Sequence, residues 1–179
     1  MIITGKYPQL RLRRNRYHVW SRKLITENNL SVNDLIMPIF IIDCKNKKIP
    51  VKTMPGVFRY SLDKLNSVVQ SAIYLGIPMV ALFPYTKGSL KNPLGTESLN
   101  PNNLVCRACK QIKKKFKNKI GIMCDVALDP YTSHGHDGVF LKGDVDNDET
   151  VKILSEQALI QASAGCDVLA PSDMMDGRI

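Results

Sequence analysis

The sequence predicts an α/β fold, in which a parallel β-sheet is covered by helices. Short apolar runs of strand length alternate with longer stretches of helical periodicity between residues 35 and 171. The apolar runs are hydrophobic at consecutive positions, which is typical of strands buried on both faces. Such a sheet is either open and doubly wound or closed into a barrel, and the pattern alone allows both.

The first 30 residues differ from the rest of the chain. They are polar and basic, and they contain no sustained apolar period. We therefore predict two regions: a basic N-terminal arm with a short helix over residues 1–30, and the α/β unit over residues 31–179.

The α/β unit begins with a predicted strand at residues 35–42, "LIMPIFII". A helix is predicted at residues 61–76, where Ser61 is suited to cap the start and Gly76 to end it. Its apolar residues recur at helical spacing: Leu62, Leu65, Val69 and Ala72. The second predicted strand is "MVALF" at residues 79–83.

The same alternation continues to the end of the chain. A second helix is predicted at 102–117, a third strand at 120–128 and a third helix at 148–165, ending at Gly165. We expect one face of that third helix to be buried, formed by Val151, Leu154, Ala158 and Ala162. The fourth predicted strand is "DVLAP" at residues 167–171.

Composition narrows the class of protein. The chain has 179 residues, of which 44% are hydrophobic and 23% are charged, the profile of a soluble globular domain. It contains no apolar run near the length of a membrane span, and its first residues lack the continuous apolar stretch of a secretory signal. We expect a cytoplasmic protein without a membrane partner.

The five cysteines do not form a disulfide or zinc pattern. Cys106 and Cys109 make a single C-x-x-C, and a zinc site of this kind needs a second pair. We interpret both as residues on the buried face of a helix.

The net charge of +9 raises a nucleic-acid alternative. The basic residues gather in two clusters: Arg11, Arg13, Arg14, Arg16, Arg22 and Lys23, and Lys110, Lys113, Lys114, Lys115, Lys117 and Lys119. No nucleic-acid-binding motif accompanies them, and the lysines end a predicted helix, where cations are favourable. A basic nucleic-acid-binding domain is therefore the less favoured hypothesis.

Polar residues follow two neighbouring predicted strands. Asp125 comes at the end of the third strand, and Ser172 and Asp173 follow the fourth. Barrel enzymes build their active sites at the carboxyl ends of the strands, and open sheets do so at a switch point. No glycine-rich phosphate motif follows any strand, which disfavours a nucleotide-binding fold.

Three stretches closely resemble the signatures of the 5-aminolevulinate dehydratase (porphobilinogen synthase) family: "MPGVFRYS" at 54–61, "CDVALDPYTSHGHDG" at 124–138 and "APSDMMDGRI" at 170–179. The resemblance implies a (β/α)8 barrel, of which this chain supplies about the first four βα units. It implies condensation of two 5-aminolevulinate molecules to porphobilinogen in tetrapyrrole and heme biosynthesis. It also implies a homo-oligomer, usually an octamer, whose N-terminal arm wraps a neighbouring subunit.

The resemblance assigns roles to four residues. Asp125 and Ser172 are expected to be catalytic, although Ser172 is also suited to cap a following helix. Asp129 and Asp137 are expected to bind the substrate ammonium group, for which anionic acceptors are suitable once water is excluded. Without the resemblance, a polar surface loop would be the favoured interpretation of this segment.

Zinc is not expected. Zinc-dependent members carry three cysteines in this loop, at positions occupied here by Ala127, Asp129 and Asp137, so the loop resembles that of the zinc-independent, aspartate-type members. His134 and His136 are not zinc ligands in the family. We expect no cofactor in this chain, and magnesium is possible for a full-length member.

The family's two Schiff-base lysines, its carboxylate-binding arginines and its magnesium ligand match positions beyond residue 179. No lysine occurs in the four predicted strands, and Lys142 and Lys152 are expected to be solvated with ordinary pKa values. We therefore expect the chain alone to be inactive; a noncatalytic fragment or a degraded gene product is the alternative. Bare edges on its first and last strands would make it aggregation-prone or partner-dependent.

Overall fold

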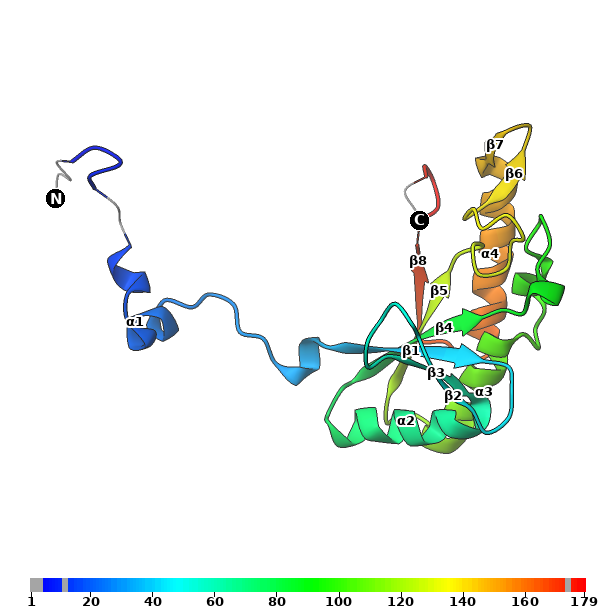
Figure 1. The fold of residues 1–179 in the computed structure, drawn as a ribbon, viewed down its shortest axis with the longest axis horizontal. Helices are drawn as coiled ribbons and strands as arrows, with labels where there is room; N and C mark the ends of the chain where they lie inside the picture. The colour runs from blue at the N-terminus through cyan, green and yellow to red at the C-terminus, as the bar shows by residue number, and fades with distance from the viewer. Residues whose placement is uncertain (1–4, 11–12, 173–174) are drawn as a thin grey trace. The chain divides into compact units, whose positions relative to one another are not determined.

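The computed structural model describes residues 5–10, 13–172 and 175–179, and Figure 1 shows its ribbon. The chain divides into two compact units, Met1–Ser31 and Val32–Ile179. The first unit holds the 3-10 helix η1 (Arg14–Arg16) and the short helix α1 (Val19–Leu24). Several of its large apolar side chains are exposed, namely Tyr17, Val19, Trp20 and Leu24. Arg11, which belongs to the basic cluster predicted for the arm, lies outside the described residues.

The second unit is built on a six-stranded sheet with the order β2-β3-β1-β4-β5-β8. Its centre consists of the four predicted strands, all parallel and neighbours in chain order. These are β1 (Ile36–Ile42), β4 (Met79–Tyr85), β5 (Gly121–Val126) and β8 (Val168–Pro171). This succession is that of a barrel wall, since a doubly wound sheet reverses its strand order at a switch point.

A helix connects each of these strands to the next (Figure 1): α2 (Leu62–Tyr74), α3 (Leu104–Phe116) and α4 (Asn147–Ser163). Three single-turn 3-10 helices lie before β1 and between β4 and α3: η2 (Val32–Asp34), η3 (Gly88–Leu90) and η4 (Thr96–Leu99). Within the described residues, no helix is long and apolar enough to cross a membrane.

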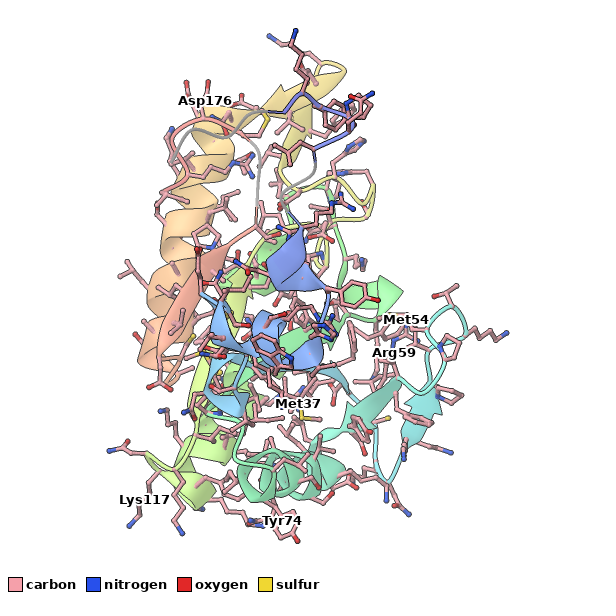
Figure 2. All side chains as sticks on the ribbon, turned by 90° about the vertical axis from the view of Figure 1, so that its left-hand side faces the viewer. Met37, Met54, Arg59, Tyr74, Lys117 and Asp176 are labelled. Carbon is pink, nitrogen blue, oxygen red and sulfur yellow. The ribbon has the colours of Figure 1, made fainter. Side chains whose placement is uncertain are left out.

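The two faces of the sheet differ in burial. On one face, which we call the helix-covered face, side chains are at most 1% exposed and pack against the helices: Ile39, Ile41, Val80, Leu82, Ile122 and Cys124. Met37, labelled in Figure 2, packs with them. The alternate residues form what we call the open face: Ile36, Phe40, Phe83, Tyr85, Met123 and Asp125. Each of these is at least partly exposed.

Two short hairpins were not predicted from the sequence. Strands β2 (Lys48–Pro50) and β3 (Phe58–Ser61) pair antiparallel, and β3 also pairs parallel with β1 over Phe40–Ile42. The expectation that the outer edge of the first strand is bare is therefore wrong for its carboxyl half. The second hairpin, β6 (Val139–Leu141) with β7 (Asp144–Asp146), precedes α4.

The predicted helix ends are mostly confirmed. Gly76 and Gly165 both have positive φ, which glycine adopts without strain, and each follows the last turn of its helix. Ser61 occupies the cap position of α2, but its side chain does not cap the helix. Its hydroxyl instead accepts from the Lys47 backbone N–H at 3.0 Å and donates to the Lys47 carbonyl at 3.1 Å.

The predicted buried face of α4 is partly wrong. Leu154 is buried as expected, but Ala162 is exposed, and the other buried residues of the helix are Thr150, Gln157 and Gln161. Polar side chains are buried here because they bond to backbone groups in and around the site described below. The prediction for Cys106 and Cys109 is confirmed, since both are fully buried in α3.

Candidate active site

Asp125 lies at the carboxyl end of β5 and belongs to the open face. It pairs with Ala170 on β8, and since Leu82 pairs with Cys124, Phe83 of β4 lies beside it on the other side. The chain therefore places this carboxyl where barrel enzymes carry their reacting groups.

Three carboxyl groups act on one another at this point. Burial, together with the smaller effect of the neighbouring Asp129 and Asp137 carboxylates, raises the pKa of Asp125 to about 6. Burial also raises the pKa of Asp129 and of Asp137. A ligand with an ammonium group would lower the cost of ionising these carboxyl groups.

The loop after β5 is anchored to the protein. Asp137 Oδ1 accepts from the Leu128 backbone N–H at 2.6 Å. The Thr132 hydroxyl donates to the His136 carbonyl at 2.9 Å, and Tyr131 is buried. The first of these bonds holds the Asp137 side chain against the start of the loop, whereas Asp129 is exposed.

Two glutamines on α4 support this site, and the sequence analysis missed both. Gln161 Nε2 donates to the Asp125 carbonyl at 2.9 Å, and Gln157 Nε2 donates to the Ala127 carbonyl at 3.2 Å. The two residues are one helical turn apart and almost fully buried. The two glutamines are spaced one turn apart on a helix face that was otherwise expected to be apolar. This spacing is the sequence signal that would have indicated buried polar side chains.

Cationic residues reach the loop from distant parts of the sequence. Lys91 Nζ donates to the Asp129 carbonyl at 3.3 Å, and Arg178 Nη1 donates to the Asp137 carbonyl at 3.1 Å. The Lys91 charge opposes the increase in the pKa of Asp129, and the Arg178 charge does the same for Asp137. Neither contact could be read from local sequence.

The histidines of the loop are engaged in other interactions. His134 Nδ1 accepts from the His136 backbone N–H at 3.1 Å, and Nε2 lies 3.0 Å from the Pro93 carbonyl, so it carries the proton. The His136 ring stacks on Phe140 with centroids 4.5 Å apart. Ala127 offers no ligand, and the described part of the chain contains no group of three or more potential metal ligands.

Ser172 directly follows β8, and its backbone N–H donates to the Val126 carbonyl at 3.4 Å. This places it next to the carboxyl end of β5, with its side chain exposed. The alternative role of Ser172 as a helix cap would involve residues 173 and 174, which lie outside the described residues. Asp173 lies outside the described residues.

Lysines are absent from β1, β4, β5 and β8. Lys142 and Lys152 are both exposed, as predicted. The expectation of an ordinary pKa is wrong for Lys152, because its bond to Glu149 raises the pKa of the amine. A raised pKa keeps the amine protonated and unsuited to imine formation.

Comparison with known proteins identifies the fold and the family. A family model described as delta-aminolevulinic acid dehydratase matches residues 9–179. A protein of that name from Bradyrhizobium diazoefficiens is 55% identical over 170 residues, which cover 95% of this chain and 48% of the relative. That of Chlamydia pneumoniae is 46% identical, with 94% of this chain and 51% of the relative covered.

This chain belongs to the delta-aminolevulinic acid dehydratase family. It also resembles the crystal structure of the Toxoplasma gondii delta-aminolevulinic acid dehydratase (porphobilinogen synthase) in complex with its product porphobilinogen. That likeness has 42% sequence identity and a TM-score of 0.87, and it covers 95% of this chain and 48% of the other. The prediction of an incomplete (β/α)8 barrel is confirmed. The dehydratase relatives are about twice as long as this chain, which spans about half of each.

Proposed function

We propose that this chain forms the part of a porphobilinogen synthase active site that carries the substrate-binding acids. The enzyme condenses two 5-aminolevulinate molecules to porphobilinogen with loss of two waters. The observation that carries the proposal is the cluster of Asp125, Asp129 and Asp137 at the carboxyl end of β5, in a member of this family. The porphobilinogen bound to the Toxoplasma relative supports the substrate class.

In this proposal the three carboxyl groups receive the substrate ammonium. The pKa of Asp125, about 6, is close to neutral pH. A cation that arrives beside this carboxyl group favours its ionised form. A carboxylate beside a substrate ammonium can also accept the proton that must leave before the amine reacts with a carbonyl. Ser172, exposed at the end of the neighbouring strand, would contact the same substrate through its hydroxyl.

Imine formation needs a neutral amine nucleophile, and we propose that this chain does not supply it. The open face holds no lysine on β1, β4, β5 or β8. The chain alone should therefore bind substrate without turnover, and the imine-forming lysines of the family would come from residues outside these 179.

We also propose that this loop works without zinc. A zinc site built on thiolates has no equivalent where Ala127, Asp129 and Asp137 stand, and hard carboxylate oxygens suit magnesium better. Magnesium dependence of a full-length protein remains a prediction.

The arm is proposed to pack against another copy of the protein in the cytoplasm, in an octamer like that of the family. Exposed Trp20, Val19 and Leu24 form a small apolar surface on a helix that is too short to be stable in isolation. Its basic residues would then be rim residues of a protein interface, which accounts for the charge of the arm without a nucleic-acid partner.

Borohydride trapping tests the proposal. The purified chain is incubated with 5-aminolevulinate and borohydride and then weighed by mass spectrometry, alone and mixed with the remaining half of the Bradyrhizobium relative. We expect no adduct on this chain, an adduct on the added half, and porphobilinogen only from the mixture. When the Asp125→Asn variant replaces this chain in the mixture, porphobilinogen formation should be abolished.

Three results would contradict the proposal. An adduct on a lysine of this chain, or porphobilinogen from this chain alone, would show that it supplies its own amine. A mixture that assembles, as judged by sedimentation, yet forms no porphobilinogen would favour the noncatalytic alternative.

A further inference from the structure

The loop after β5, which we call the acid loop (residues 127–138), is joined by backbone bonds to the loop that connects β4 to α3. The contact is made by residues 91–93 of that second loop, which we call the brace. The Asn92 N–H donates to the Tyr131 carbonyl at 3.3 Å, and the Asn92 carbonyl accepts from the Ser133 N–H at 3.1 Å. The brace and the acid loop therefore pair in the manner of two short parallel strands.

The brace keeps its shape through bonds of its own. The Asn92 side-chain oxygen accepts from the backbone N–H groups of Leu94 and Thr96 at 3.0 and 3.2 Å. An asparagine that folds its side chain back onto the following backbone amides fixes a turn. The Pro93 carbonyl lies 3.0 Å from Nε2 of His134, a residue of the acid loop. The brace is thus a preformed support for the acid loop.

Lys91, the first residue of the brace, bonds to the backbone of Asp129. Its Nζ donates to the Asp129 carbonyl at 3.3 Å. Within the described residues, Lys91 forms no ion pair with a carboxylate, and Asp129 is exposed. The lysine therefore holds the backbone of Asp129 and leaves the carboxylate accessible to a ligand.

The charge of Lys91 also acts on that carboxylate. Partial desolvation raises the pKa of Asp129, and the Lys91 ammonium opposes this increase. The other charged groups of the cluster are Asp125 on β5, whose pKa is raised to about 6, and Asp137 on the acid loop, on which Arg178 acts. The arrangement separates the acids: Asp129, beside a lysine, ionises more readily, and Asp125 keeps its proton closer to neutral pH.

We propose that Lys91 is a positioning residue for the acid cluster: it holds Asp129 on the brace and keeps its carboxylate ionised, so that an arriving substrate ammonium meets a charged acceptor. The identity of that ligand rests on the proposed function, whereas the action of Lys91 on Asp129 does not. The competing role is structural, in which Lys91 fastens two loops and its charge has no effect on the carboxylate.

Titration of the Asp129 carboxyl group by NMR separates these roles. The carboxyl carbon is followed against pH in the parent chain and in Lys91→Met, which removes both the charge and the donor. We expect the pKa of Asp129 to rise in Lys91→Met, because the ammonium that favours the ionised form is lost. Lys91→Arg keeps a charge and donors and should restore the parent pKa. Lys87→Met, the same charge change at an exposed lysine of the same loop, should leave it unchanged.

Binding of 5-aminolevulinate gives a second readout, with a defined pH dependence. In Lys91→Met the Asp129 carboxylate takes up its proton at a higher pH, so binding near pH 5 should be about threefold weaker than in the parent. At pH 8 the carboxylate is ionised in both proteins, and binding should be no weaker. Calorimetric titration at the two pH values measures this difference. Lys91→Gln, which also lacks the charge, replaces Lys91→Met if that variant does not fold.

The outcomes distinguish failure of this inference from failure of the proposed function. An unchanged pKa of Asp129 in Lys91→Met, or a raised pKa that Lys91→Arg does not restore, would overturn the positioning role. Binding weakened equally at both pH values, which a purely structural role predicts, would also overturn it. A pKa of Asp129 that depends on Lys91 as expected, in a chain that binds no 5-aminolevulinate, would support the action of Lys91 and contradict the proposed substrate.

Discussion

The two faces of one sheet serve different purposes in this protein. On the helix-covered face, residues such as Ile39, Leu82 and Ile122 are at most 1% exposed and form the core with α2, α3 and α4. On the open face, Ile36 and Tyr85 are 44% and 47% exposed, and the face also carries Asp125. The strands alternate between these environments at every residue.

The difference between the two faces separates the residues that stabilise the fold from those suited to bind a ligand. The helix-covered face supplies the apolar burial that holds the chain together, whereas the open face carries aromatic rings and Asp125, an acid whose pKa is raised. Substitutions on the first face should therefore change the free energy of unfolding, and substitutions on the second should mainly change binding.

The largest expected effect compares two isoleucines on β1. Ile39→Ala removes a side chain that is 1% exposed and should reduce the free energy of unfolding by about 2–5 kcal/mol, since it leaves a cavity. Ile36→Ala, on the open face, should cost less than about 1 kcal/mol. Urea unfolding of both variants measures the difference, and equal losses would contradict the assignment of the faces.

A glycine near the site gives the next largest effect. A Cβ at Gly138 would lie 2.6 Å from Val145 Cγ1 and 2.9 Å from Thr150 Oγ1. Thr150 cannot move away easily, because its hydroxyl accepts from the Val139 N–H and donates to the Asp146 carbonyl. Gly138→Ala should cost about 1–3 kcal/mol.

Gly88→Ala is the matched control for this substitution, since nothing lies within 4 Å of its Cβ position. Thermal unfolding of both variants measures the difference, and Gly88→Ala should be nearly neutral. A neutral Gly138→Ala would mean that the β6–β7 hairpin is not packed on α4.

Gln161 links the helix-covered side to the open face, because its amide on α4 donates to the Asp125 carbonyl. Gln161→Leu should cost about 1–2 kcal/mol through an unsatisfied buried carbonyl. It should also broaden the amide resonances of Asp125 and Val126 in NMR spectra. A stable variant with an unchanged spectrum would show that β5 does not need this support.

Substitution of Asp125 should have the smallest effect on the free energy of unfolding, and this effect should depend on pH. Its pKa is raised from 3.8 to about 6 in the folded state, so the unfolded chain releases its proton first, and rising pH between these values destabilises the fold. Asp125→Asn removes this cost and should be more stable than the parent at pH 8 by about 1 kcal/mol, after allowance for solvent screening.

The stability advantage of Asp125→Asn should shrink as the pH falls from 8 toward 4. Thermal unfolding at several pH values checks this, with the exposed Glu156→Gln on α4 as a control. A pH-independent difference would contradict the raised pKa.

Much of the fold could be predicted from the sequence because the strands of the barrel wall are continuous apolar runs and the helices have apolar periods. The hairpins β2–β3 and β6–β7 could not, because strands of three or four residues show no period. The buried face of α4 was mispredicted at Gln157 and Gln161, whose burial depends on carbonyls supplied by β5 and the loop after it.

The candidate active site was likewise only partly predictable from the sequence. Asp125 and Ser172 could be placed from the sequence, since each follows an apolar run. Lys91 and Arg178 contact the loop across 38 and 41 residues of sequence, so only the folded chain brings them there.

Methyl NMR during titration with 5-aminolevulinate tests most directly the claim that the open face binds substrate. We expect chemical shift changes at Met123, Ala170 and Ile42, which lie on the open face near Asp125 and Tyr85, with Ile39, Val80 and Ile122 unmoved. Asp125→Asn should suppress the changes. Shifts confined to the helix-covered methyl groups, or none at saturating ligand, would contradict the account.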